Sequence, residues 1–239
     1  GADDTELVYV EKDRLMKLPG SFRLVRCQQC GLLYLNPRPT SEEMQQYYPE
    51  EYMAYSIAPE DEQSWITRLD RSYGDWRRAR VVTAASPQGG RLLDVGCATG
   101  NFLHMMRRLG PWEVHGLDIS PIATAYARER YGLDVVTGEL TQAGYPDSHF
   151  DVVTMWDVLE HVYDPKGTLI EIHRILNPAG LLLVRVPNIC TWDAQLFGPY
   201  WVGLDAPRHL FVFSPPTMQS LLQKTGFRVY QMRSLILSY

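Results

Sequence analysis

Residues 89–102 read "GGRLLDVGCATGNF", and this stretch decides the fold. Its apolar run does not alternate with polar residues, as in a strand buried on both faces of a sheet, and it ends at Asp94. Gly96 and Gly100 follow closely, and residues 101–110 then carry apolar side chains at helical spacing. This order predicts a buried strand, a glycine-containing turn and a helix.

The alternation of strand and helix continues along the chain. We expect further strands at residues 113–120, 133–140, 150–158, 180–188 and 227–237. We expect helices at residues 121–132, 165–176 and 216–226, and a turn, "NPAG", at 177–180. Such alternation predicts parallel βαβ units. Right-handed crossovers then give an α/β fold: a Rossmann-like, doubly wound sheet, mostly parallel, with helices on both faces.

The amino-terminal part has a different character. Residues 1–39 are strand-poor and turn-rich, and they include a CxxC formed by Cys27 and Cys30. Thr40 opens a T-x-x-E capping box, and residues 64–85 carry apolar side chains at helical spacing. We therefore divide the chain into a small extension (1–39), a helical cap (40–86) and the α/β domain (87–239).

The CxxC lies in "RCQQCGLLYLNPRP", which resembles the second half of a zinc ribbon. A structural zinc site needs four ligands. Residues 1–26 contain no Cys and no His that could complete the set. We therefore expect no bound metal at this motif.

The composition argues against several classes of function. The chain has 239 residues, 45% of them hydrophobic and 21% charged, with a net charge of −5, which is ordinary for a globular protein. No apolar run approaches the length of a membrane span, the start "GADDTELVYV" is acidic, and no region is strongly basic. The four cysteines form no disulfide framework. We expect a cytoplasmic monomer or homodimer that binds a small-molecule substrate, and neither nucleic acid nor membrane.

The ligand of the glycine turn can be narrowed by three features. The spacing is G-x-x-x-G, with Ala98 where a dinucleotide fingerprint has its middle glycine. Asp94 would repel a pyrophosphate but could hold a cationic group. Asp118 ends the next strand, where an acid can accept both ribose hydroxyls. A ligand with a ribose, a cationic amine and no pyrophosphate is S-adenosyl-L-methionine (SAM).

Four segments in register resemble the successive motifs of class I SAM-dependent methyltransferases: "LLDVGCATG", "VHGLDIS", "FDVVTMWDVLEHV" and "LNPAGLLLVRVPN". The resemblance covers residues 91–188 and implies a methyl transfer from SAM. It implies that Asp94, Gly96, Cys97 and Gly100 line the methionine end of the cofactor and that Asp118 binds the ribose. It also implies that Ile119, Glu139 and Leu140 lie near the adenine, and that Trp156 and Asp157 face the sulfonium.

The sequence defines the residues that would contact the methyl acceptor less clearly than those that would bind SAM. Removing a proton from an acceptor hydroxyl needs a base, and His161 and His209 are the candidates. His209 lies in a long connection at about residues 189–213 that is rich in aromatic side chains and resembles a stretch seen in bacterial methyltransferases of small molecules or sugars. In this insertion, Tyr200, Trp201 and Arg208 are candidates for binding the substrate. Arg208 could instead pair with Asp205 and fix the loop.

Three function classes remain. The first is a SAM-dependent methyltransferase acting on a small molecule such as a sugar or another metabolite hydroxyl. The second is a protein of the same fold that binds SAM or a partner without catalysis. The third is an NAD-dependent oxidoreductase, against which Ala98 and Asp94 both count.

Overall fold

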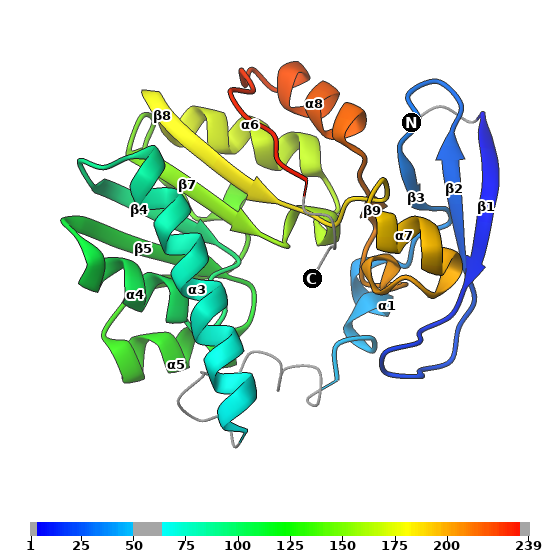
Figure 1. Cartoon of the computed structure of the whole chain (residues 1–239), viewed down its shortest axis with the longest axis horizontal. Coiled ribbons are helices and arrows are strands. Elements are labelled where there is room, and N and C mark those ends of the chain that lie inside the picture. Colours follow the sequence, from blue (N-terminus) through cyan, green and yellow to red (C-terminus); the bar gives the residue numbers. More distant parts are fainter. Residues whose placement is uncertain (1–3, 50–63, 235–239) are drawn as a thin grey trace. The chain divides into compact units, whose positions relative to one another are not determined.

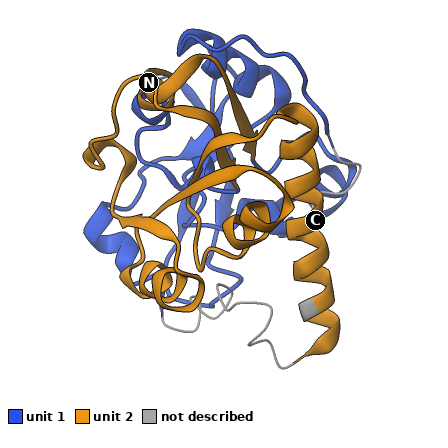
Figure 2. Cartoon of the chain, turned by 90° about the vertical axis from the view of Figure 1, so that its left-hand side faces the viewer, with its two compact units in different colours: residues 1–52, 157–169, 186–239 blue, residues 53–156, 170–185 orange. Residues whose placement is uncertain are grey.

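The computed structural model describes residues 4–49 and 64–234. The described residues form two compact units (Figure 2). Unit 1 gathers those within 1–52, 157–169 and 186–239, and unit 2 gathers those within 53–156 and 170–185. The boundaries expected at residues 39 and 86 do not coincide with this division, because the amino-terminal extension pairs with residues from the far end of the chain.

Unit 2 is the predicted α/β fold (Figure 1). Its five-stranded sheet has the order β6-β5-β4-β7-β8, and every strand pairing is parallel. The strands are β4 (Gly90–Val95), β5 (Trp112–Asp118), β6 (Asp134–Thr137), β7 (Phe150–Trp156) and β8 (Leu176–Arg185). The order reverses at β4, because β5 lies on one side of it and β7 on the other. Open α/β sheets bind their ligands at such a switch point, beyond the carboxyl ends of the strands.

The helices of unit 2 connect these strands. They are α3 (Trp65–Ala85), α4 (Asn101–Leu109), α5 (Pro121–Tyr131) and the part of α6 (Pro165–Ile175) that belongs to this unit, with a short 3₁₀ turn η2 (Leu140–Gln142). Helix α4 connects β4 to β5, and α6 connects β7 to β8, in the opposite direction across the sheet. Right-handed crossovers therefore place α4 and α6 on opposite faces of the sheet. One core cluster joins α3, α4 and α5 to the sheet.

Two local predictions need correction. The "NPAG" segment at 177–180 is not a turn that precedes a strand but lies inside β8, where it bulges against β7 between the pairs Phe150↔Leu176 and Val152↔Leu181. The strand expected at 227–237 is absent over residues 227–234, which have no regular secondary structure, and the remainder lies outside the described residues. Its alternation of side chains was a poor guide because a strand also requires a paired neighbour.

Unit 1 is built on an antiparallel sheet with the order β1-β2-β3-β9. Its strands are β1 (Thr5–Glu11), β2 (Phe22–Cys27), β3 (Leu33–Leu35) and β9 (Phe211–Val212). The prediction that residues 1–39 are strand-poor is therefore wrong. The CxxC lies where β2 turns into β3, and its amide and carbonyl groups close that hairpin.

The other elements of unit 1 are short. They are α1 (Ser41–Gln45), η3 (Leu159–His161), the amino-terminal part of α6, α7 (Trp192–Phe197), η4 (Gly198–Tyr200), η5 (Val202–Leu204) and α8 (Pro215–Lys224). The capping box at Thr40 is formed as predicted. Within the two described ranges, no helix has the length and apolar character required to cross a membrane.

Candidate functional site

The loop between β4 and α4 has a backbone that few side chains tolerate. Gly96, Ala98 and Gly100 all have positive φ angles, of 77°, 48° and 79°. A Cβ on Gly100 would lie 2.6 Å from Leu133 Cδ1, so a glycine is required there for steric reasons as well. The strain at Ala98 is sustained by hydrogen bonds, because strained backbone persists only where its surroundings determine it.

Those hydrogen bonds attach the loop to the end of β5. The amides of Gly96 and Cys97 donate to the Leu117 carbonyl at 2.7 and 3.1 Å, and the Ala98 amide donates to Asp118 Oδ2 at 2.8 Å. These three bonds, all made within the chain, hold the loop against the end of β5. Helix α4 begins directly after the loop, so the partial positive charge of its amino terminus lies next to the loop.

Asp118 is a half-buried acid at the carboxyl end of β5. Its Oδ1 accepts from the Ser120 amide at 2.8 Å, in addition to the bond from Ala98 to Oδ2. Burial raises the pKa of this carboxyl, and the two amide donors oppose that rise. Each carboxylate oxygen has capacity for a second donor, so Asp118 can also accept hydrogen bonds from two hydroxyls of a ligand.

Asp94 is buried near the carboxyl end of β4, with 3% of its surface exposed. Its Oδ1 accepts from Thr154 Oγ1 at 2.6 Å. Burial raises the pKa of Asp94 to about 7, and the negative charges of Asp75 and Asp118 add to the rise. A cation bound beside this carboxylate would reverse the effect, so the site is electrostatically suited to an ammonium group.

Trp156 ends β7 on the other side of β4, and its ring meets Phe102 edge to face at 5.8 Å. Its indole Nε1 is buried and has no hydrogen-bond partner among the residues that the structure describes. A buried donor of this kind costs free energy unless a ligand or water satisfies it. Together with the two acids and the rigid loop, this donor fits a polar cofactor at the switch point.

The other predicted cofactor residues differ in exposure. Ile119 is 72% exposed directly after β5, so it can cover an apolar ring. Glu139 is exposed as the N-cap of η2, whereas Leu140 beside it is buried. Cys97 is buried beneath the loop, and burial raises the pKa of its thiol well above the usual value, which makes it an inert packing group.

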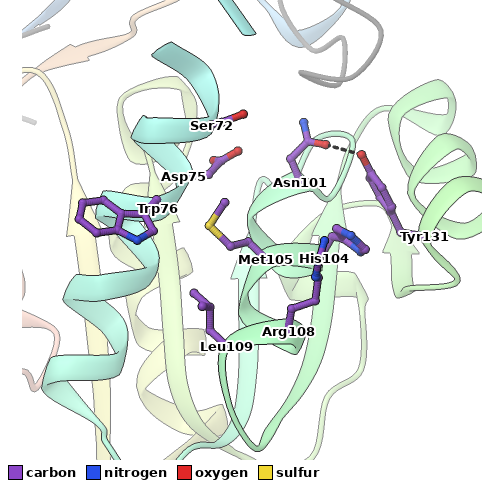
Figure 3. Close-up of a pocket in the computed structure, with 9 residues that line it drawn as sticks. All are labelled: Ser72, Asp75, Trp76, Asn101, His104, Met105, Arg108, Leu109 and Tyr131. Atoms are coloured by element: carbon purple, nitrogen blue, oxygen red, sulfur yellow. Dashed lines mark hydrogen bonds between the residues drawn. The ribbon is translucent and has the colours of Figure 1, made fainter. Parts of the chain in front are cut away.

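A separate cavity of about 440 Å³ lies between α3 and α4 (Figure 3). Asp75 and Trp76 line it from α3, while Asn101 and His104 line it from α4. Tyr131 donates to Asn101 Oδ1 at 2.9 Å and stacks on His104. None of the predicted cofactor residues lines this cavity, so it is a feature distinct from the loop and its two acids.

The structure brings together the two histidines of the acceptor side in unit 1. The rings of His161 and His209 lie 4.6 Å apart between centroids; His209 is buried and His161 is half-buried. Burial lowers the pKa of His161 to about 3 and lowers that of His209, so both rings are neutral at pH 7. Asp157, which directly follows β7 in the chain, has a positive φ of 56°.

Sequence reasoning missed one member of this group. The fully buried Glu160 places Oε1 4.0 Å from His209 Nε2. The signal was present in the adjacent letters of "LEHV", where an acid, a residue type that is rarely buried unless paired, precedes the histidine inside an apolar segment.

Arg208 does not have the position expected of a substrate anchor. Its side chain is fully buried, and its guanidinium donates to Asp13 at 2.7 and 3.1 Å and to Asp205 at 2.6 and 3.0 Å. With a fifth bond to the Tyr47 carbonyl at 3.1 Å, these contacts occupy the N–H edges of the guanidinium that would recognise an anionic substrate. The alternative, in which Arg208 pairs with Asp205 and fixes the loop, is the one that the contacts support, with Asp13 as a further partner.

The two aromatic candidates in the same insertion also differ. Trp201 is buried and donates its indole proton to Asp193 Oδ2 at 2.9 Å, so its ring is part of the unit 1 core rather than a free substrate platform. Tyr200 is 71% exposed, and the Arg14 guanidinium lies 4.4 Å from its ring centroid. Of the three insertion residues, Tyr200 alone presents its side chain at the surface.

Comparisons with known proteins agree with this geometry. The profile of the methyltransferase domain family matches residues 66–232. A malonyl-[acyl-carrier protein] O-methyltransferase of Serratia marcescens is 31% identical over 134 residues, which is 56% of this chain and 51% of that protein. A Mycolicibacterium smegmatis protein named "Probable S-adenosylmethionine-dependent methyltransferase" is 32% identical over 161 residues, which is 64% of this chain and 59% of that protein. The chain thus spans between half and three-fifths of the length of these relatives.

Solved structures share the fold. A methyltransferase of Haloferax volcanii in complex with the activator Trm112 superposes with a TM-score of 0.59 at 22% identity, covering 76% of this chain and 78% of that one. The [4+2]-cyclase SpnF superposes with a TM-score of 0.55 at 23% identity, covering 79% and 74%. The loop, the two acids and the family match over most of the chain lead to one conclusion: this chain belongs to the methyltransferase domain family, whose cofactor is S-adenosyl-L-methionine.

Proposed function

We propose that this protein transfers a methyl group from SAM to a small-molecule acceptor. One observation carries the proposal: a rigid, glycine-dependent loop joins two buried or half-buried acids, Asp94 and Asp118, at adjacent strand ends. A dinucleotide would bring a pyrophosphate to the same loop, where its charge would disfavour the ionised form of Asp94, whereas a cationic group would stabilise that form. This arrangement favours a ligand that is cationic near β4 and carries hydroxyls near β5.

The cofactor-binding roles follow from the surroundings of each residue. Asp94 would hold the cationic amine, and Asp118 would accept from the ribose hydroxyls, since it keeps acceptor capacity beyond its two amide bonds. Gly96, Cys97 and Gly100 would shape the wall along the methionine end. Ile119, Glu139 and Leu140 would lie along the adenine, with Ile119 as the exposed apolar cover.

When bound, SAM supplies a methyl group already activated by a sulfonium sulfur. The chain's own task is then to position the two reactants, an effect that can supply roughly 7–11 kcal/mol of the barrier. Trp156, with its buried and unsatisfied N–H, would orient the cofactor at the end of β7, where Asp157 follows it in the chain. A rigid loop serves this purpose better than a mobile one because no ordering cost arises on binding.

The acceptor is proposed as a small molecule with a hydroxyl group, such as a sugar or another metabolite. The relatives are named for different acceptors, malonyl-[acyl-carrier protein] and demethylmenaquinone, so their names do not identify one acceptor for this chain. On this proposal, His161 or His209 receives the hydroxyl proton, since both rings are neutral. Tyr200 offers an exposed ring against which an acceptor can pack. We further propose a cytoplasmic monomer or homodimer, in keeping with its free cysteines.

The test is transfer of a labelled methyl group from SAM to a panel of sugars and small phenols. We expect turnover with at least one class of acceptor and its loss, by about a hundredfold or more, in Asp118→Ala. Glu113→Ala on the same strand is the matched control, because Glu113 is an exposed acid outside the site. SAM binding without turnover on any acceptor would support the non-catalytic alternative, and binding of NADH instead of SAM would support the oxidoreductase.

A further inference from the structure

Glu160, His161 and His209 form a compact group inside unit 1, which we call the Glu–His–His cluster. One ligand atom from each of the three lies within 4.8 Å of the others. Glu160 and His161 are consecutive in η3, whereas His209 comes from the loop that precedes β9. Among the described residues, no other group of three or more His, Cys, Asp or Glu side chains converges in this way.

Backbone carbonyls fix the proton position in both rings. His209 Nδ1 lies 2.9 Å from the Gly203 carbonyl, and His161 Nδ1 lies 3.0 Å from the Arg208 carbonyl and 3.1 Å from the Tyr48 hydroxyl. A carbonyl oxygen only accepts, so each Nδ1 carries the hydrogen and each Nε2 carries the lone pair. This is the arrangement that metal-binding histidines adopt, in which a carbonyl or carboxylate holds the remote ring N–H and orients the ring.

The loop that carries His209 is held firmly against η3. The Leu210 amide donates to the Glu160 carbonyl at 2.8 Å, and the His209 amide donates to the Asp205 carbonyl at 3.1 Å. The buried Arg208 side chain anchors the same loop through Asp13 and Asp205. Three donors from two distant segments are therefore preorganised, so little ordering would be required for binding.

The charge of the cluster also favours a cation. The fully buried acid Glu160 lies with its Oε1 4.0 Å from His209 Nε2, and the acid Asp157 adds negative potential at His209. The nearby cation Arg208 is already matched by the two acids Asp13 and Asp205.

We infer that the Glu–His–His cluster binds a divalent first-row transition-metal ion of the Zn²⁺ type. Imidazole nitrogen suits Zn²⁺ and its neighbours, whereas Mg²⁺ and Ca²⁺ select oxygen. A tetrahedral ion with bonds of about 2.1 Å needs ligand atoms roughly 3.4 Å apart, so the 4.0 Å between Glu160 Oε1 and His209 Nε2 requires only a small rotation of the side chains. Two histidines and one glutamate leave a coordination position for water or another oxygen ligand.

This inference gives the histidines a role other than general base. An Nε2 lone pair that binds a metal is not available to accept a proton. If the protein is a methyltransferase as proposed, the ion would bind the acceptor oxygen and lower the pKa of its hydroxyl, which makes proton loss easier. The metal site itself stands on the geometry of unit 1 and does not depend on methyl transfer.

The experiment is a titration of the chelator-treated 239-residue chain with Zn²⁺ by calorimetry, and with Co²⁺ by visible absorption. We expect one ion per chain and a Co²⁺ spectrum without a sulfur charge-transfer band. Glu160→Gln keeps the side-chain shape and should weaken binding by about tenfold or more, as should His209→Asn. His173→Asn and Cys30→Ser are the matched controls, because one removes an exposed histidine of α6 and the other removes the exposed cysteine of the CxxC.

Three results would overturn the inference. They are no metal binding by the wild-type chain, wild-type metal affinity in both Glu160→Gln and His209→Asn, and loss of the ion in Cys30→Ser. Thermal unfolding of Glu160→Gln without metal shows whether the variant is folded, so weak binding by a folded variant counts as support. SAM affinity is measured on the same samples and should not change in Glu160→Gln. Metal binding without methyl transfer would support the metal site and contradict the proposed function. Methyl transfer without metal binding would support the proposed function and contradict the metal site.

Discussion

At the residue scale, burial rather than exposure gives the important side chains their properties. Asp94 is buried, and burial raises its pKa to about 7, far above the usual value for an aspartate. Arg208 is held by two carboxylates that neutralise it inside unit 1. In both cases the sequence identifies the residue, but only the surroundings show what it does.

Asp94→Asn should change how stability depends on pH. Because the folded-state pKa is raised to about 7, the native chain keeps a proton on Asp94 that the unfolded chain loses above about pH 4. The free energy of unfolding therefore falls as pH rises from about 4 to 7, by at most about 4 kcal/mol from this group. Asparagine has no proton to lose in this range, so Asp94→Asn does not undergo this fall in the free energy of unfolding. Its stability relative to wild type should therefore increase between pH 5 and pH 8.

Urea unfolding at several pH values checks this expectation, with Asp70→Asn, an exposed acid on α3, as the matched control. A stability difference between Asp94→Asn and wild type that stays constant with pH would show that Asp94 is ionised in the unliganded protein.

Arg208→Ala should destabilise the fold by about 3–5 kcal/mol, because it leaves the Asp13 carboxylate buried without its strongest partner. Asp13→Ala should cost a similar amount by leaving the guanidinium with one acid fewer. The double variant should cost less than the sum of the two, which chemical denaturation measures as a coupling free energy. Normal stability in Arg208→Ala, with only acceptor affinity reduced, would instead restore Arg208 as a substrate anchor.

At the scale of elements, local patterns predicted unit 2 well and unit 1 poorly. The strands of the parallel sheet are buried on both faces, so their apolar runs are legible without knowledge of their partners. The antiparallel sheet of unit 1 includes β9, two residues long, which pairs with β3 from the other end of the chain. A strand so short carries no periodic signal, and its pairing is a property of the tertiary structure.

The β4–α4 loop is the element on which the cofactor proposal depends. Gly100→Ala should both destabilise the chain and weaken SAM binding, because its Cβ would meet Leu133 at 2.6 Å on a backbone with φ of 79°. We expect a loss of about 1–3 kcal/mol in the free energy of unfolding. Gly132→Ala is the matched control, since its φ is also positive, at 59°, but a Cβ there has open space. Equal losses of stability and SAM affinity in the two variants would contradict this role for the loop.

At the scale of the whole molecule, the candidate sites divide by how local their residues are. The residues proposed to bind the cofactor follow strand ends of unit 2 in a regular order, so the sequence alone places Asp94, Asp118 and the glycine loop at one edge of the sheet. In unit 1, the ion pair between Arg208 and Asp13 joins positions 195 residues apart, and no sequence pattern announces it. Glu160 completes the Glu–His–His cluster only because the His209 loop folds onto η3.

The central claim is that the β4–α4 loop and its two acids bind SAM. Calorimetric titration of the 239-residue chain with SAM and S-adenosylhomocysteine, with NADH as the control ligand, tests this claim most directly. We predict micromolar binding of the first two, no binding of NADH, and proton release on SAM binding near pH 6, because an ammonium beside Asp94 lowers its raised pKa. Absence of SAM binding, or binding of NADH in its place, would contradict the account.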